Sequence, residues 1–276
     1  MTEESDQTKE KEELAEGTLI SHLVELRQRL VWAVASVFIV FLCLVPFVQP
    51  IFNYVSAPLT DVLPDDSDLI SIGIVAPFMT PFKTTLFVAL FLAMPIVLYQ
   101  LWQFVAPGLY KKEQRFAFPL LFSSILLFYG GVAFAYFVVF RLVFPFLIGI
   151  TPDNVVNMPD IDQYLSFILR IFLAFGLAFE VPIATFMLVW SRLVTLETLG
   201  RVRPYVFLGA FVVGMFLTPP DIFSQTFLAV PIYILYEAGL ILSRVLLRDR
   251  LREQAEEAEA EAEAEAEAEA EEQADE

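Results

Sequence analysis

The chain has 276 residues, of which 57% are hydrophobic and only 18% are charged, and its mean hydropathy is +0.65. In soluble domains about a quarter of all residues are charged, so this composition indicates an integral membrane protein. The single cysteine, Cys43, and the single histidine, His22, exclude an internal disulfide, a cysteine-based metal site and a multi-histidine metal site.

The formal net charge of -17 comes from the two ends of the chain. Residues 1–25 hold eight acids and two lysines, and residues 251–276 hold 13 acids and one arginine. Segments of this kind repel themselves and have no apolar face, so residues 1–17 and 246–276 are predicted to be acidic, disordered tails. The membrane domain is predicted to occupy residues 18–245.

The membrane domain contains six apolar runs after an amphipathic helix at residues 18–30. The predicted crossings are residues 30–48, 84–105, 116–140, 171–190, 205–217 and 222–242. The last two are expected to be short and joined by a tight turn, because Thr218-Pro-Pro-Asp221 cannot continue a helix. Prolines in or beside the spans predict bent helices. The expected fold is an all-α membrane protein, a curved bundle of six transmembrane helices with short helices 5 and 6.

Basic residues predict the orientation of the bundle. With six crossings and both termini inside, the cytoplasmic segments hold 14 lysines and arginines and the outside segments hold 3. Positive residues concentrate on the cytoplasmic side of membrane proteins, so this division predicts that the N- and C-termini are both cytoplasmic.

Two acidic residues lie within the apolar runs. Glu180 is the tenth residue of the fourth span, where an acid costs about 2.5–3.5 kcal/mol on insertion scales. We therefore expect it to face the bundle interior or a water-filled cavity. It is predicted to be a partner-binding or proton-linked site, and the alternative is a structural acid satisfied by a neighbouring helix. Glu237, near the inner end of the last span, is expected to pair with Arg244 or to reach the interface.

The first cytoplasmic loop contains a lone acid, Glu113, among three basic residues. Its carboxylate is a suitable acceptor for a guanidinium group. Composition alone favours the alternative, in which Glu113 pairs with the basic residues of its own loop. Glu25 has a similar alternative, because Arg29 is its i,i+4 neighbour on the amphipathic helix.

Polar residues also flank the Pro219–Pro220 break. Thr218 precedes it and Gln225 follows it by one turn. A functional cluster and an ordinary polar helix start explain this placement equally well.

Four stretches of the sequence together resemble the TatC family, the polytopic subunit of the twin-arginine protein translocase. They are SHLVELRQRL at 21–30, YQLWQFVAPGLY at 99–110 followed by Glu113, FGLAFEVP at 175–182, and RPYVFLGAFVVGMFLTPPD at 203–221. They occur in the family's order, and the resemblance extends over about residues 18–245 without the two tails. One departure is Gln114, where many relatives are expected to carry another base.

The resemblance implies a receptor for signal peptides that carry two consecutive arginines. Such a protein lies in the cytoplasmic membrane of a bacterium and moves folded proteins with TatA and TatB, driven by the proton-motive force. It is not an enzyme and needs no cofactor. The implied signal-peptide site is Glu25, Phe104 and Glu113, which favours the acceptor role of Glu113.

The resemblance also assigns the polar residues of the later helices. Glu180 matches the family's intramembrane polar residue, and the implied docking site for TatA and TatB is Met215, Thr218 and Gln225. The residues are also compatible with two other classes of function. A proton-coupled solute transporter would use Glu180 as its relay but would show related halves with broken helices, of which there is one short pair. An intramembrane enzyme would need a nucleophile–base pair or metal ligands, for which the chain has little material.

Overall fold

The computed structural model describes residues 2–60, 70–105, 117–149, 160–191, 193–217 and 222–248. Over these ranges the regular structure is helical, and the isolated β-bridge between Ile70 and Asp160 is the only strand-like pairing. Five helical stretches are long and apolar enough to cross a membrane, and a shorter apolar helix, Arg203–Leu217, accompanies them. The five are Leu23–Ala57, Ala76–Phe104, Phe118–Val143, Ile161–Trp190 and Ile222–Leu246. The predicted all-α fold with six membrane helices is confirmed.

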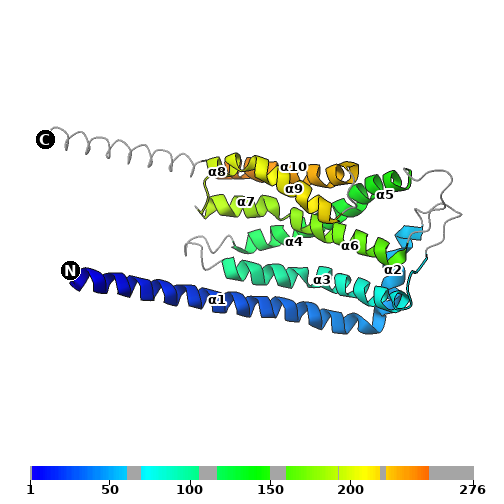
Figure 1. The fold of residues 1–276 in the computed structure, drawn as a ribbon, viewed down its shortest axis with the longest axis horizontal. Coiled ribbons are helices and arrows are strands. Elements are labelled where there is room, and N and C mark those ends of the chain that lie inside the picture. Colours follow the sequence, from blue (N-terminus) through cyan, green and yellow to red (C-terminus); the bar gives the residue numbers. More distant parts are fainter. Residues whose placement is uncertain are drawn as a thin grey trace. The chain divides into compact units, whose positions relative to one another are not determined.

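The chain forms two compact units, which divide between Leu177 and Ala178. In the first unit, the long helix α1 (Thr2–Leu44) packs along α3 (Ala76–Val105), as Figure 1 shows. The 3-10 turn Val45–Phe47 contains Pro46 and separates α1 from α2 (Val48–Thr60). Helix α1 begins at Thr2, within the segment that the sequence predicts to be an acidic tail. Glutamate, lysine, glutamine and alanine are good helix formers, so the acidic segment can continue the helix towards the N-terminus.

Two more helical stretches complete the first unit. α4 (Ala117–Phe134) continues through a π-helical turn, Ala135–Val139, into α5 (Phe140–Gly149), and α6 spans Ile161–Ala178. The indole Nε1 of buried Trp102 on α3 donates to the hydroxyl of buried Ser124 on α4 over 3.1 Å. A buried N–H without a partner would be costly, so this bond fixes the pairing of α3 with α4.

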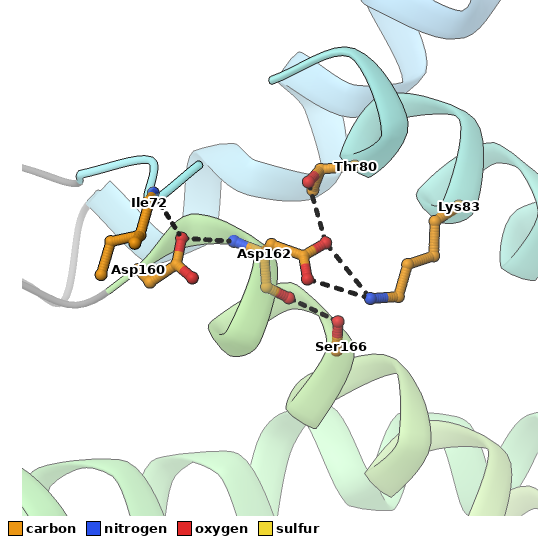
Figure 2. A network of polar contacts seen from close by, with 6 residues as sticks. All are labelled: Ile72, Thr80, Lys83, Asp160, Asp162 and Ser166. Carbon is orange, nitrogen blue, oxygen red and sulfur yellow. Dashed lines mark hydrogen bonds and ion pairs between the residues drawn. The ribbon is translucent and has the colours of Figure 1, made fainter. Parts of the chain in front are cut away.

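A polar network joins α3 and the residues just before it to the start of α6 (Figure 2). The carboxylate of Asp162 accepts from Thr80 Oγ1 at 2.8 Å and from Lys83 Nζ, which lies 3.2 Å from each carboxylate oxygen. Asp160 Oδ1 accepts from the backbone N–H of Ile72 at 3.4 Å. The backbone N–H of Ile161 also donates to Ile70 O over 2.9 Å. Two segments almost 90 residues apart in sequence are therefore held together at one end of the first unit.

The second unit contains α7 (Val181–Trp190), α8 (Leu196–Arg201), α9 (Arg203–Leu217) and α10 (Ile222–Leu246). α10 packs against both α7 and α9. The prediction of a short sixth helix is wrong, since α10 has 25 residues, whereas α9 has only 15. α10 continues past residue 242 because the hydroxyl of Ser243 bonds to Gly239 O within the helix, which satisfies that polar group in apolar surroundings.

Large apolar side chains cover the outside of these helices. Leu30 and Phe38 on α1 are 60% and 57% exposed, Phe216 on α9 is 74% exposed, and Ile241 on α10 is 60% exposed. A soluble monomer rarely exposes apolar surface on this scale, whereas helices in lipid do so without penalty.

Candidate functional site

An apolar groove lies between α1 and α3 in the first unit. Its volume is about 160 Å³. It is lined by Leu26, Arg29, Leu30 and Ala33 of α1 and by Val97, Gln100, Leu101 and Phe104 of α3. The two helices supply residues at i, i+3, i+4 and i+7 spacing, which places each set on one helix face. Phe104, one of the predicted signal-peptide residues, is therefore part of a formed groove.

Polar groups border this groove. Arg29 Nη2 donates to Glu25 Oε1 over 3.3 Å and to Gln103 Oε1 over 3.4 Å, so Arg29 links α1 to α3. The side chains of Glu25 and Arg29 are each about one third exposed, at 32% and 31%. The i,i+4 pair expected as the alternative for Glu25 is present, and it brings Glu25 beside the groove through Arg29. An incoming guanidinium must share or displace Arg29 to reach this carboxylate.

The floor of the groove carries one further acceptor. Gln100 Oε1 is buried, and no donor from the described residues reaches it. A buried carbonyl oxygen without a partner costs about 1–3 kcal/mol, so this atom favours a ligand that brings an N–H group. Sequence reasoning missed Gln100, although it stands next to Leu101 within the 99–110 stretch. Glu113, the third predicted signal-peptide residue, lies outside the described residues.

Glu180 occupies the break between α6 and α7. α6 ends at Ala178 and α7 starts at Val181, with Pro182 in its first turn. Proline cannot donate a backbone hydrogen bond, so a helix can begin but not easily continue through this position. Glu180 Oε1 is buried, while the backbone carbonyl of Glu180 accepts from Ala184 N over 2.9 Å. The carboxylate is thus directed inward at a helix start, in agreement with the expectation of an interior environment.

The predicted docking residues lie in different environments. Met215 on α9 is 51% exposed. Gln225 on α10 is half-buried, and its Nε2 donates to the Phe211 carbonyl of α9 over 2.7 Å. Gly214 lets α9 approach Gln225 closely, since a Cβ at 214 would lie 3.1 Å from Gln225 Cγ. Gln225 therefore joins α9 to α10, whereas Met215 faces outward. Thr218 lies outside the described residues.

Glu237 pairs with Arg203, which corrects the expected pair with Arg244. Arg203 Nε lies 2.7 Å from Glu237 Oε1 and its Nη2 lies 2.9 Å from Oε2, and Tyr233 also donates to Oε1 over 2.9 Å. The pair forms because α9 and α10 pack together, which brings residues 34 positions apart into one hydrogen bond and one close ion-pair contact. Sequence reasoning missed Arg203 because it weighed only neighbours on the same helix. The available signal was that an acid inside a span requires a partner.

Comparison with known proteins identifies relatives over most of the chain. A family model described as Sec-independent protein translocase protein (TatC) matches residues 21–231. A protein of that name from Azotobacter chroococcum mcd 1 is 56% identical over 221 residues, which cover 80% of this chain and 87% of the relative. The Escherichia coli K12 protein of the same name is 53% identical over 226 residues, covering 82% and 88%. A crystal structure described as the twin arginine translocase receptor TatC superposes with a TM-score of 0.74 at 36% identity, covering 81% of this chain and 98% of that chain.

Proposed function

This chain belongs to the TatC family and is a core subunit of the Sec-independent Tat protein translocase, and from that premise we propose that it captures twin-arginine signal peptides at the α1–α3 groove. It is a multi-pass protein of the bacterial inner membrane and a component of protein transport. The observation that carries the proposal is the apolar groove lined by Phe104 and bordered by the carboxylate of Glu25.

The chemistry of the groove suits a peptide that is both cationic and apolar. A guanidinium binds a carboxylate through two parallel hydrogen bonds, which a lysine ammonium cannot reproduce. Glu25 supplies one carboxylate beside the groove, and Glu113 follows α3 closely enough in sequence to supply a second. The buried Oε1 of Gln100 accepts from the peptide, and the apolar lining receives the side chain beside the arginines.

The later helices serve the steps after capture. TatA and TatB dock at the α9–α10 edge, where Met215 is exposed and Gln225 joins the two helices, and Thr218 follows α9 directly in the sequence. Glu180 is the proton-linked or partner-binding acid, which the buried Oε1 atom supports. Both termini face the cytoplasm, in accord with the distribution of basic residues. The protein carries out no covalent catalysis, and no observation favours a solute transporter.

The test compares binding of a twin-arginine peptide and its twin-lysine version to the full-length protein. Loss of one charge-assisted pair costs about 1.5–3 kcal/mol, so Glu113→Gln and Glu25→Gln should each weaken twin-arginine binding by about 10-fold or more. Glu10→Gln is the matched control, because it removes the same charge from the same helix at a position about 22 Å further along its axis.

The pattern of affinity losses distinguishes binding at the groove from general electrostatic attraction. Weaker twin-arginine binding by Glu25→Gln and Glu113→Gln, with Glu10→Gln unchanged, supports the site. Wild-type affinity in the Glu113→Gln protein would refute the proposed site. An equal loss of peptide affinity in all three variants would refute it as well.

A further inference from the structure

A second concave site lies in the second unit, away from the residues used for signal peptides. Its volume is about 500 Å³. It is lined by Leu196, Glu197, Gly200 and Arg201 of α8, Arg203 of α9, and Leu240 and Arg244 of α10. Three arginines from three different helices thus meet around one cavity. Neither the relatives' names nor the sequence motifs assign a role to this cavity.

The charges of this cavity do not cancel. Arg203 is held by Glu237 at 2.7 Å and Arg201 by Glu197 at 2.6 Å. Arg244 is exposed and forms no ion pair with the residues that the structure describes. Three arginines against these two carboxylates leave one positive charge. Arg203 also keeps donors available among the described residues, because a guanidinium has five N–H groups and only its Nη2 donates a hydrogen bond to Glu237.

The cavity lies at the end of membrane-spanning helices. Arg203 begins α9 and Arg244 lies in the last turn of α10, so both stand where an apolar span ends. Tyr205, two residues into α9, is 74% exposed, as aromatic residues at the lipid–water boundary commonly are. On α10 the neighbours of the lining residues, Ile241 and Val245, are 60% and 66% exposed. A cationic hollow therefore adjoins an apolar face at the depth of lipid headgroups.

We propose that this arginine cavity binds the phosphodiester group of an anionic phospholipid. Guanidinium forks match phosphate oxygens, and basic pockets between membrane helices are suited to acidic headgroups. One phosphodiester carries one negative charge, which balances the single excess charge of the cavity. Free inorganic phosphate offers the same oxygens, but a lipid adds acyl chains that lie along Ile241 and Val245. This site is independent of signal-peptide capture.

Native mass spectrometry of the full-length protein in a mild detergent tests the proposal. Phosphatidylglycerol, phosphatidylcholine of the same chain length, and inorganic phosphate are titrated separately. The wild type should retain phosphatidylglycerol in preference to the other two. Arg244→Gln should lower that affinity about five-fold, which is the contribution of one basic residue near anionic lipid. The acidic C-terminal segment is present in every arm, so it competes equally in all of them.

Arg248→Gln is the matched control, because Arg248 is exposed, follows Arg244 by one helical turn and does not line the cavity. It should leave the preference for phosphatidylglycerol unchanged. Arg201→Gln provides a second cavity variant should Arg244→Gln fold poorly, which a thermal melt reports. Equal losses in the cavity variants and Arg248→Gln overturn the proposal, since they mean unspecific surface attraction. Phosphatidylcholine bound as tightly as phosphatidylglycerol overturns it, and so does inorganic phosphate bound as tightly as the lipid.

Discussion

Gly239 sets the distance between α7 and α10, and replacing it tests the packing of the second unit. A Cβ at position 239 would lie 2.9 Å from Pro182 Cα and 3.1 Å from Thr185 Cβ, both on α7. Backbone atoms cannot yield as a flexible side chain does, so Gly239→Ala must push the helices apart. Overpacking costs about 1–3 kcal/mol. Alanine in place of a helical glycine returns up to about 1 kcal/mol. The expected net loss is therefore about 1 kcal/mol.

Thermal unfolding of the purified protein, followed by tryptophan fluorescence, measures this loss. Buried Trp190 ends α7 and reports directly on the helix that must move. A loss of about 1 kcal/mol lowers the Tm of a chain of this size by about 2–4 °C. Gly209→Ala is the control, because a Cβ at 209 on α9 meets no atom within 4 Å and should leave the Tm equal or higher. A Gly239→Ala protein that melts at or above Gly209→Ala would refute the packing argument.

Two further predictions concern the same unit. Arg203→Ala removes the ion-pair partner of the partly buried Glu237 carboxylate, so it should destabilise the protein by about 1–3 kcal/mol. Adding Glu237→Gln should recover much of this loss in a double-mutant cycle, whereas additive losses would contradict the argument. α9 spans about 22 Å, whereas the hydrocarbon core of a bilayer is about 30 Å thick. Inserting one apolar turn into α9 should therefore impair cargo export, measured with a reporter, and should spare peptide binding, measured by a pull-down. Normal export by the lengthened protein would show that the short span is not required.

The positions of the membrane helices follow from local sequence, which is why the six crossings could be predicted. Apolar length identifies a span regardless of its neighbours. Boundaries were predicted less well where polar residues adjoin a span. α3 begins at Ala76 rather than at 84, because Thr80 and Lys83 are satisfied by Asp162 and the helix can continue past them. Such a contact spans about 80 residues of sequence, so no local pattern reveals it.

The site residues that the sequence predicts make local contacts, whereas those that only the structure reveals depend on contacts between distant segments. Glu25 and Arg29 are a local pair that helix spacing alone predicts, and the structure contains it. The ion pair between Arg203 and Glu237 depends on how α9 packs against α10, which no local sequence pattern reveals. The same dependence explains why Gln100 was overlooked. Its buried acceptor becomes visible only when α1 covers that face of α3.

The packing of α9 against α10 gives Gln225 and Met215, the two predicted docking residues that the structure describes, different environments. Gln225 Nε2 is engaged by the Phe211 carbonyl at 2.7 Å, and Gly214 packs against its side chain. In apolar surroundings, breaking this hydrogen bond so that Gln225 could contact another helix would leave a donor unsatisfied, at a cost of about 1–3 kcal/mol. Met215 exposes half of its surface and is not tied to α10 by such a hydrogen bond. Methionine side chains are flexible and adapt their shape to a partner. A docking helix would therefore meet Met215 first, while Gln225 holds the short helix in position for it.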